Sequence, residues 1–200
     1  MMRPDHVPTS RPTLTLETNR LLLRDIQEED WPAIVEYHRD PEVRRYLLPG
    51  QGTKADVRRW VHDAVLSTKS EPRGSYALAV VLKERYEIIG TCMLQKATTG
   101  SRNARIGFDL DRRHWNHGYT TEAMKRLVAF GFQECGVARV FADCFAANGA
   151  SIRVMEKLGM ERYGRSRFYP WVLAFAYGVN RPIARYTLPA WRWSESSPVA

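Results

Sequence analysis

The strongest constraint on the fold comes from residues 105–134, where the hydrophobic period changes from two to about 3.6. Apolar and polar side chains alternate over residues 105–111, which predicts a half-buried strand. A polar loop follows, and residues 121–134 then carry an apolar stripe at helical spacing. The next apolar run, residues 138–145, predicts another strand. A strand, a helix and a strand in succession indicate a parallel crossover within a sheet.

The rest of the chain adds antiparallel strands and further helices. Two apolar runs separated by the charged triplet KER predict a hairpin, while Asn148 and Gly159 fit the N-cap and the C-terminal stop of a late helix. The other predicted strands are residues 20–26, 76–82, 87–94, 162–168 and 183–188, and the other helices are residues 30–38, 41–47, 53–68 and 148–158. The fold class is therefore α+β with a mixed sheet.

Length and composition predict one folded domain between two short tails. A chain of 200 residues with 44% hydrophobic residues can bury a core. Residues 1–13 contain three prolines among polar side chains, and a similar polar composition ends the chain at residues 194–200. We therefore expect flexible tails on either side of a single domain that spans residues 14–193.

The formal charge of +8 (30 basic and 22 acidic residues) favours an anionic partner, such as a nucleotide-bearing cofactor, an acidic protein or nucleic acid. A solvated basic surface without a specific partner explains the charge equally well. A basic run with interleaved aromatic residues is absent from the sequence, so a nucleic-acid groove is not favoured.

The cysteines and histidines argue against disulfide and metal chemistry. Cys92, Cys135 and Cys144 are odd in number and form no CxxC pair, which disfavours a disulfide framework or a thiolate zinc site. His114 and His117 lack a surrounding acidic or sulfur ligand pattern, so no metal is expected. The chain contains no apolar run of about 18 residues and starts without the apolar segment of a secretory signal. A cytoplasmic protein without a membrane partner is the expectation.

The loop DRRHWNHGYTTEA, between the predicted strand and the predicted helix, is suited to an anion. The first turn of a helix presents free backbone N–H groups and the positive end of the helix dipole. Gly118 lacks a Cβ, so a phosphate can approach the backbone closely. The alternative is an ordinary turn with Thr120 as N-cap. A Walker lysine and a GxGxxG motif are both missing, which excludes two other nucleotide sites.

Four stretches together resemble the GNAT N-acetyltransferase superfamily, and in particular its branch of ribosomal-protein alanine N-acetyltransferases. They are LETNRLLLRDIQEEDWPAI, EIIGTCML, IGFDLDRRHWNHGYTTEAMKRLVAFGF and RVFADCFAANGASIRVMEKLGMERYGR, and they occur in the family's order. The resemblance covers residues 14–168. It implies a central mixed sheet of about six to seven strands flanked by helices, with the fourth and fifth strands splayed apart.

The resemblance also implies a binding site for acetyl-coenzyme A. The family's cofactor loop falls on residues 115–120; Gly118 keeps the consensus, while Asn116 and Thr120 depart from it. The pantetheine arm is expected to pair with the strand backbone at residues 108–110 and to pass the start of the late helix. The implied cofactor-binding residues are Phe108, Leu110, Asn116, His117, Gly118, Tyr119, Thr120, Thr121, Asn148 and Ser151.

Acetyl transfer to an amine requires a neutral amine, a polarised thioester carbonyl and a proton for the leaving thiolate. Asp109 and Asp111 lie on the non-core face of the predicted strand, so either carboxylate is a candidate base, with Glu87 as a rival. The alternative is that these carboxylates are simply solvated.

The proton donor is the second catalytic assignment. Many members of the family use a tyrosine at the position of Met155, which cannot donate a proton. Ser151, one turn earlier, becomes the candidate acid, although a contact to coenzyme A without proton transfer explains it equally well. Tyr163 and Tyr169 are further candidates.

These assignments predict an N-acetyltransferase that works by direct attack of an amine on acetyl-coenzyme A. A protein amino terminus is the favoured acceptor, because its pKa of about 8 leaves an appreciable neutral fraction near neutral pH. A small-molecule amine of the aminoglycoside type is the alternative acceptor. A different class of function also remains open: a catalytically weak module that senses coenzyme A or binds nucleic acid. The expected assembly is a monomer or a homodimer.

Overall fold

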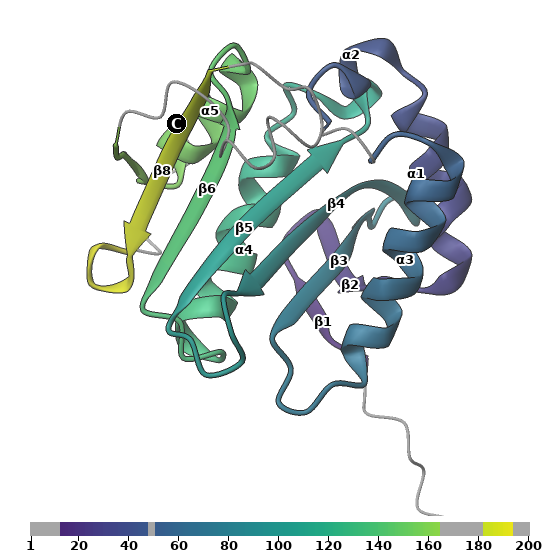
Figure 1. The fold of residues 1–200 in the computed structure, drawn as a ribbon. Coiled ribbons are helices and arrows are strands. Elements are labelled where there is room, and N and C mark those ends of the chain that lie inside the picture. The colour runs from purple at the N-terminus through teal and green to yellow at the C-terminus, as the bar shows by residue number, and fades with distance from the viewer. Residues whose placement is uncertain (1–12, 48–50, 165–181, 194–200) are drawn as a thin grey trace, which may run out of the picture.

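The computed structural model describes residues 13–47, 51–164 and 182–193. In this part of the chain, eight strands form one mixed sheet in the order β1-β2-β3-β4-β5-β6-β8-β7 (Figure 1). The strands are β1 Thr15–Glu17, β2 Leu21–Asp25, β3 Ser75–Leu82, β4 Glu87–Lys96, β5 Asn103–Leu110, β6 Arg139–Phe145, β7 Glu161–Arg162 and β8 Ile183–Pro189. The α+β class is confirmed, and the short β1 is the strand that the sequence pattern does not predict.

The helices cover both faces of this sheet. They are α1 Trp31–His38, α2 Pro41–Arg44, α3 Lys54–Thr68, α4 Tyr119–Gln133 and α5 Gly149–Lys157, with 3-10 turns η1 Glu28–Asp30, η2 Arg112–His114 and η3 Ala190–Arg192. Alternate side chains of β3 divide between two apolar clusters: Leu78 and Val80 pack with α4, whereas Ala79 and Val81 pack with α1 and α3. The sheet therefore separates two cores, as the period of two requires.

Two helix boundaries test the capping predictions. The Asn148 side chain accepts a hydrogen bond from the Ser151 amide, and Gly159 has a φ of 76° just after α5, so both capping residues are confirmed. The other boundary differs from the expectation. Helix α4 begins at Tyr119, two residues earlier than predicted, and its N-cap is Gly118 rather than Thr120. Gly118 adopts a φ of 80°, a conformation that other residues take only with strain.

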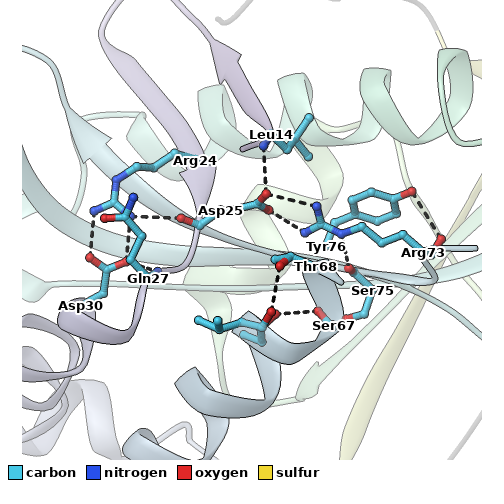
Figure 2. Close-up of polar contacts among 12 residues, drawn as sticks. Leu14, Arg24, Asp25, Gln27, Asp30, Ser67, Thr68, Arg73, Ser75 and Tyr76 are labelled. Carbon is cyan, nitrogen blue, oxygen red and sulfur yellow. Dashed lines mark hydrogen bonds and ion pairs between the residues drawn. The ribbon is translucent and has the colours of Figure 1, made fainter. Parts of the chain in front are cut away.

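A buried ion-pair corner closes the sheet where β2 ends (Figure 2). Arg73 Nη2 and Nη1 donate to the two carboxylate oxygens of Asp25 at 2.5 and 3.1 Å, and the Leu14 amide adds a third hydrogen bond at 2.9 Å. The side chains of Asp25 and Arg73 are only 7% and 8% exposed. Arg24 makes a similar two-pronged contact with Asp30 at 2.7 and 2.8 Å. Each buried carboxylate of this corner therefore has its own guanidinium.

Some expectations fall on residues that the structure does not describe. They are the tail residues 1–12 and 194–200, the end of the predicted strand at residues 165–168, and Tyr169. Within the described ranges, each helix is too short or too polar to cross a membrane.

Candidate functional site

The central opening of the sheet lies between β5 and β6. The two strands run parallel and pair at three positions, from Asn103 with Arg139 to Arg105 with Phe141, and then diverge (Figure 1). On its other edge β5 pairs with β4 as far as Leu110. The backbone of β5 beyond Arg105 therefore has a paired edge toward β4 and, in the described register, no strand partner toward β6. These are the fourth and fifth strands of the sequence prediction, so the predicted splay is found where it was expected.

The loop after β5 brings backbone amides to this opening. Asn116 and Gly118 both have positive φ angles, 63° and 80°, so the chain turns sharply into α4. The first backbone hydrogen bond of the helix runs from the Glu122 amide to the Gly118 carbonyl. The amides of residues 119–121 consequently have no acceptor inside the helix, and they lie at its positive end. Such a turn presents donors to an anionic group.

Asp109 forms a hydrogen-bonded cluster on the face of the sheet that α1 covers. Its carboxylate accepts from the Tyr37 hydroxyl at 2.6 Å and from the amide and hydroxyl of Thr91 at 3.0 Å each, and His38 Nε2 lies 3.3 Å away. Burial raises the pKa of Asp109, but the contacts with His38, Tyr37 and Thr91 lower it by more. The carboxylate thus stays ionised, and it still exposes 21% of its side chain.

Asp111 and Glu87 have different surroundings. The Asp111 carboxylate accepts from the Arg113 amide at 2.9 Å and from its guanidinium at 2.9 and 2.6 Å, so it caps η2. Burial raises the pKa of Asp111, and the contacts with Arg113 lower it by more. Glu87 lies 3.3 Å from the same guanidinium. The simply solvated alternative is therefore wrong for Asp109 and Asp111, whose side chains are 21% and 7% exposed.

The start of α5 lies on the other side of the opening, directly after β6. Asn148 caps the helix, and Ser151 is half-buried in its first turn. Met155, one turn later, is 1% exposed and belongs to the apolar core between the sheet and α4. The position where the resemblance implied a tyrosine is therefore filled by a packing residue.

Sequence reasoning missed the partners of Asp109. Tyr37 and His38 end α1, and they are 72 and 71 residues away from Asp109 in the chain. His38 is 5% exposed, and its Nδ1 is buried without a hydrogen-bond partner in the described structure. A tyrosine and a histidine near a helix end carry no pattern that connects them to a distant strand, so only the fold reveals the cluster.

Comparisons with known proteins agree with this geometry. The family model described as an acetyltransferase (GNAT) domain matches residues 20–161. A Bacillus licheniformis protein named uncharacterized N-acetyltransferase p20 is 31% identical over 155 residues, which cover 78% of this chain and 86% of that protein. The crystal structure of a GNAT-family acetyltransferase from Bacillus anthracis has a TM-score of 0.71 and 28% identity, and covers 88% of this chain and 99% of its own.

The solved structure of a ribosomal L7/L12 alpha-N-protein acetyltransferase in complex with coenzyme A has the same fold. Its TM-score is 0.74 at 17% identity, and the match covers 88% of this chain and 98% of that one.

Proposed function

Because the chain belongs to the GNAT acetyltransferase family and is therefore an acyltransferase, we propose that it moves the acetyl group of acetyl-coenzyme A to a protein amino terminus. The observation that carries the proposal is the opening between β5 and β6, with the amides of the α4 turn at one side. The features expected for the donor, an open strand edge and a set of free amides, occur side by side.

The residues around the opening fit the cofactor. The pyrophosphate is assigned to the amides of residues 116–121, where the left-handed backbone of Gly118 leaves room for close approach. The open edge of β5 at Phe108 and Leu110 is assigned to the amides of the pantetheine arm. When bound, the cofactor supplies the activated acetyl thioester.

Asp109 is the residue that we assign to the acceptor. Its partners are a tyrosine, a histidine, a threonine hydroxyl and a backbone amide, and among the described residues none of its contacts is a lysine or an arginine. An ionised carboxylate that is not bound by a lysine or an arginine attracts an ammonium group. Asp111, by contrast, is already bound to Arg113. Of the two predicted catalytic aspartates, the geometry favours Asp109.

The acceptor nitrogen has to lose two protons in the reaction. A carboxylate with a lowered pKa is a weak base, so Asp109 orients the ammonium and a water molecule carries its proton away. The neutral nitrogen attacks the thioester carbon, the C–N bond forms and the C–S bond breaks. The leaving thiolate takes a proton from the hydroxyl of Ser151 at the start of α5, and Ser151 is reprotonated by the second proton that the nitrogen loses as the amide forms.

The acceptor class follows from this weak base. An amino terminus has a pKa of about 8 and loses its proton readily, whereas a lysine amine at about 10.4 needs far more assistance. The named neighbour that acts on the alpha-amino group of a ribosomal protein supports the same choice. The charge of +8 adds a preference for acidic acceptors, and this preference should weaken with salt.

The test is a competition between two peptides of the same sequence. One has a free amino terminus and no lysine, and the other has a blocked terminus and one internal lysine; thiol release reports turnover. We expect the free terminus to react faster. Faster reaction of the lysine peptide contradicts the acceptor assignment, and turnover only with small amines supports the aminoglycoside-type alternative. Binding of coenzyme A without turnover on any amine supports a sensing module.

A further inference from the structure

Arg20, just before β2, contacts the loop that precedes α4, which lies 97 residues later in the chain. Its Nη1 donates to the His117 carbonyl at 3.0 Å, and its guanidinium carbon lies 4.4 Å from the centre of the Tyr119 ring. A Cβ placed on Gly118 would lie 3.6 Å from Arg20 Nη2. One side chain from the N-terminal part of the sheet therefore contacts His117 and Tyr119 and lies beside Gly118 between them.

Glu122 completes this arrangement from the first turn of α4. It accepts from Arg20 Nε at 2.7 Å, from the Arg20 amide at 3.0 Å and from the Thr18 hydroxyl at 2.6 Å. A carboxylate beside a site for an anion would repel that anion. Here the ion pair with Arg20 offsets the negative charge, and the hydrogen bonds direct both carboxylate oxygens toward the β1–β2 turn.

The contact with the His117 carbonyl has a geometric consequence. In a trans peptide the carbonyl and the following N–H point in opposite directions. When Arg20 holds the carbonyl of His117 on its own side, the amide of Gly118 is turned to the opposite side. Arg20 thus orients one of the donors that the anion requires.

We propose that Arg20 and Glu122 are positioning residues that hold loop 116–121 in its pyrophosphate-binding conformation, an inference that rests on the proposed function. The fork of the guanidinium matters as well as its charge. Nε donates to the Glu122 carboxylate while Nη1 donates to the His117 carbonyl. A lysine ammonium cannot make both contacts in this planar geometry.

The experiment compares Arg20→Ala and Arg20→Lys with Lys83→Ala. Lys83 is a matched control, since its described hydrogen bonds go to Glu17 and to the Thr18 carbonyl beside Arg20 and not to the loop. Calorimetry measures the Kd of coenzyme A, and hydrogen exchange measures the loop amides in the free protein. We expect Arg20→Ala to weaken coenzyme A binding at least tenfold and to accelerate exchange at residues 116–121. Arg20→Lys should recover little of either effect, and Lys83→Ala should change neither.

A truncated donor separates positioning from general damage. S-acetylpantetheine lacks the pyrophosphate, so kcat/KM for this donor should be nearly equal in wild type and Arg20→Ala, while kcat/KM for acetyl-coenzyme A falls at least tenfold. Equal losses for both donors, or full recovery by Arg20→Lys, would overturn the proposal. Failure of the wild-type protein to bind coenzyme A would instead contradict the proposed function, and the exchange of the free loop would still test the contact itself.

Discussion

Asp25 and Asp109 both lie on strands of the same sheet, but their carboxylates have different hydrogen-bond partners. Asp25 is bound by both terminal nitrogens of the Arg73 guanidinium, and the pair is almost completely buried. Asp109 has neutral hydrogen-bond donors and one histidine, and part of its side chain faces solvent. A carboxylate with a guanidinium as its built-in counterion stabilises the protein, whereas a carboxylate without a lysine or arginine partner is available to an incoming cation. The comparison predicts that the first region governs stability and the second governs turnover.

The largest effect should follow from Arg73→Ala. It leaves the Asp25 carboxylate buried without its cation, and removal of one partner of a buried pair typically costs about 3–5 kcal/mol. Urea unfolding measures the change in the free energy of unfolding. Arg39→Ala is the control, because both members of the Arg39–Glu36 pair are 70% exposed and such a pair contributes about 1 kcal/mol or less. Equal losses in the two variants would contradict the distinction.

On the catalytic side, Ser151→Ala should lower kcat while the Kd of acetyl-coenzyme A stays nearly unchanged. General acid catalysis is typically worth about 10²–10⁴-fold, so the loss is measurable in steady-state kinetics. The free energy of unfolding should change little, since Ser151 is only half-buried. If kcat is retained and Kd rises, Ser151 is a binding residue and the proton comes from elsewhere.

A smaller loss is expected for Asp109→Asn. Hydrogen bonds to charged groups contribute about 1.5–3 kcal/mol, so kcat/KM should fall by roughly 10- to 100-fold. Asp111→Asn is the companion variant, and we expect it to affect unfolding more than turnover because that carboxylate caps η2. A greater loss of kcat/KM in Asp111→Asn would reverse the assignment of the two aspartates.

The pH dependence of Asp109 follows from the direction of its pKa shift. Its pKa is lower in the folded protein than the value of about 3.9 expected in the unfolded chain. Its contribution to stability is therefore present above pH ~4 and is lost as the pH falls through the lowered pKa. Wild type and Asp109→Asn should differ in unfolding free energy at pH 7 and converge in strong acid. Since Asp109 remains ionised at neutral pH, the acid limb of kcat/KM should follow the acceptor amine.

The smallest predicted effect concerns the loop rather than either carboxylate. Gly118→Val places a β-branched residue at a φ of 80° with its Cβ 3.6 Å from Arg20 Nη2, so the strained loop must shift the amides that are assigned to the pyrophosphate. Binding of acetyl-coenzyme A should weaken about tenfold or more, which corresponds to about 1.4 kcal/mol. Calorimetry on a variant with a wild-type circular dichroism spectrum measures this change. Unchanged affinity would contradict the assignment of the pyrophosphate to this turn.

The sequence predicts the elements of this fold better than it predicts the site. Periodicity locates β3, β4, β5 and α4, because burial of one face forces apolar residues into a regular pattern. Strand β1 escapes, since three residues are too few to show a period. The sequence identifies Gly118 as the glycine of the loop, but it does not show that its left-handed conformation lets the helix begin at Tyr119, two residues before the predicted start.

The partners of Asp109 on α1 are harder to predict, because they lie 72 and 71 residues away in the chain. Asp109 and Asp111 share one face of the predicted strand. In the structure, however, Asp109 contacts Tyr37 and His38 of α1, whereas Asp111 binds Arg113 two residues later. Which carboxylate stays available depends on how α1 packs on the sheet. That packing is a tertiary property, so the sequence pattern leaves the two residues equivalent.

The opening between β5 and β6 also determines how the two halves of the sheet are joined. β4 and β5 share seven register pairs, as do β6 and β8, but β5 and β6 share three, all at one end. A donor whose amides pair with the open edge of β5 would serve as a temporary ninth strand in the described sheet. When the donor is absent, we expect β6, β7 and β8 to be joined to the rest of the sheet by these three register pairs at one end of β5. The rigidity of the sheet would then depend on the supply of a metabolite as well as on the chain.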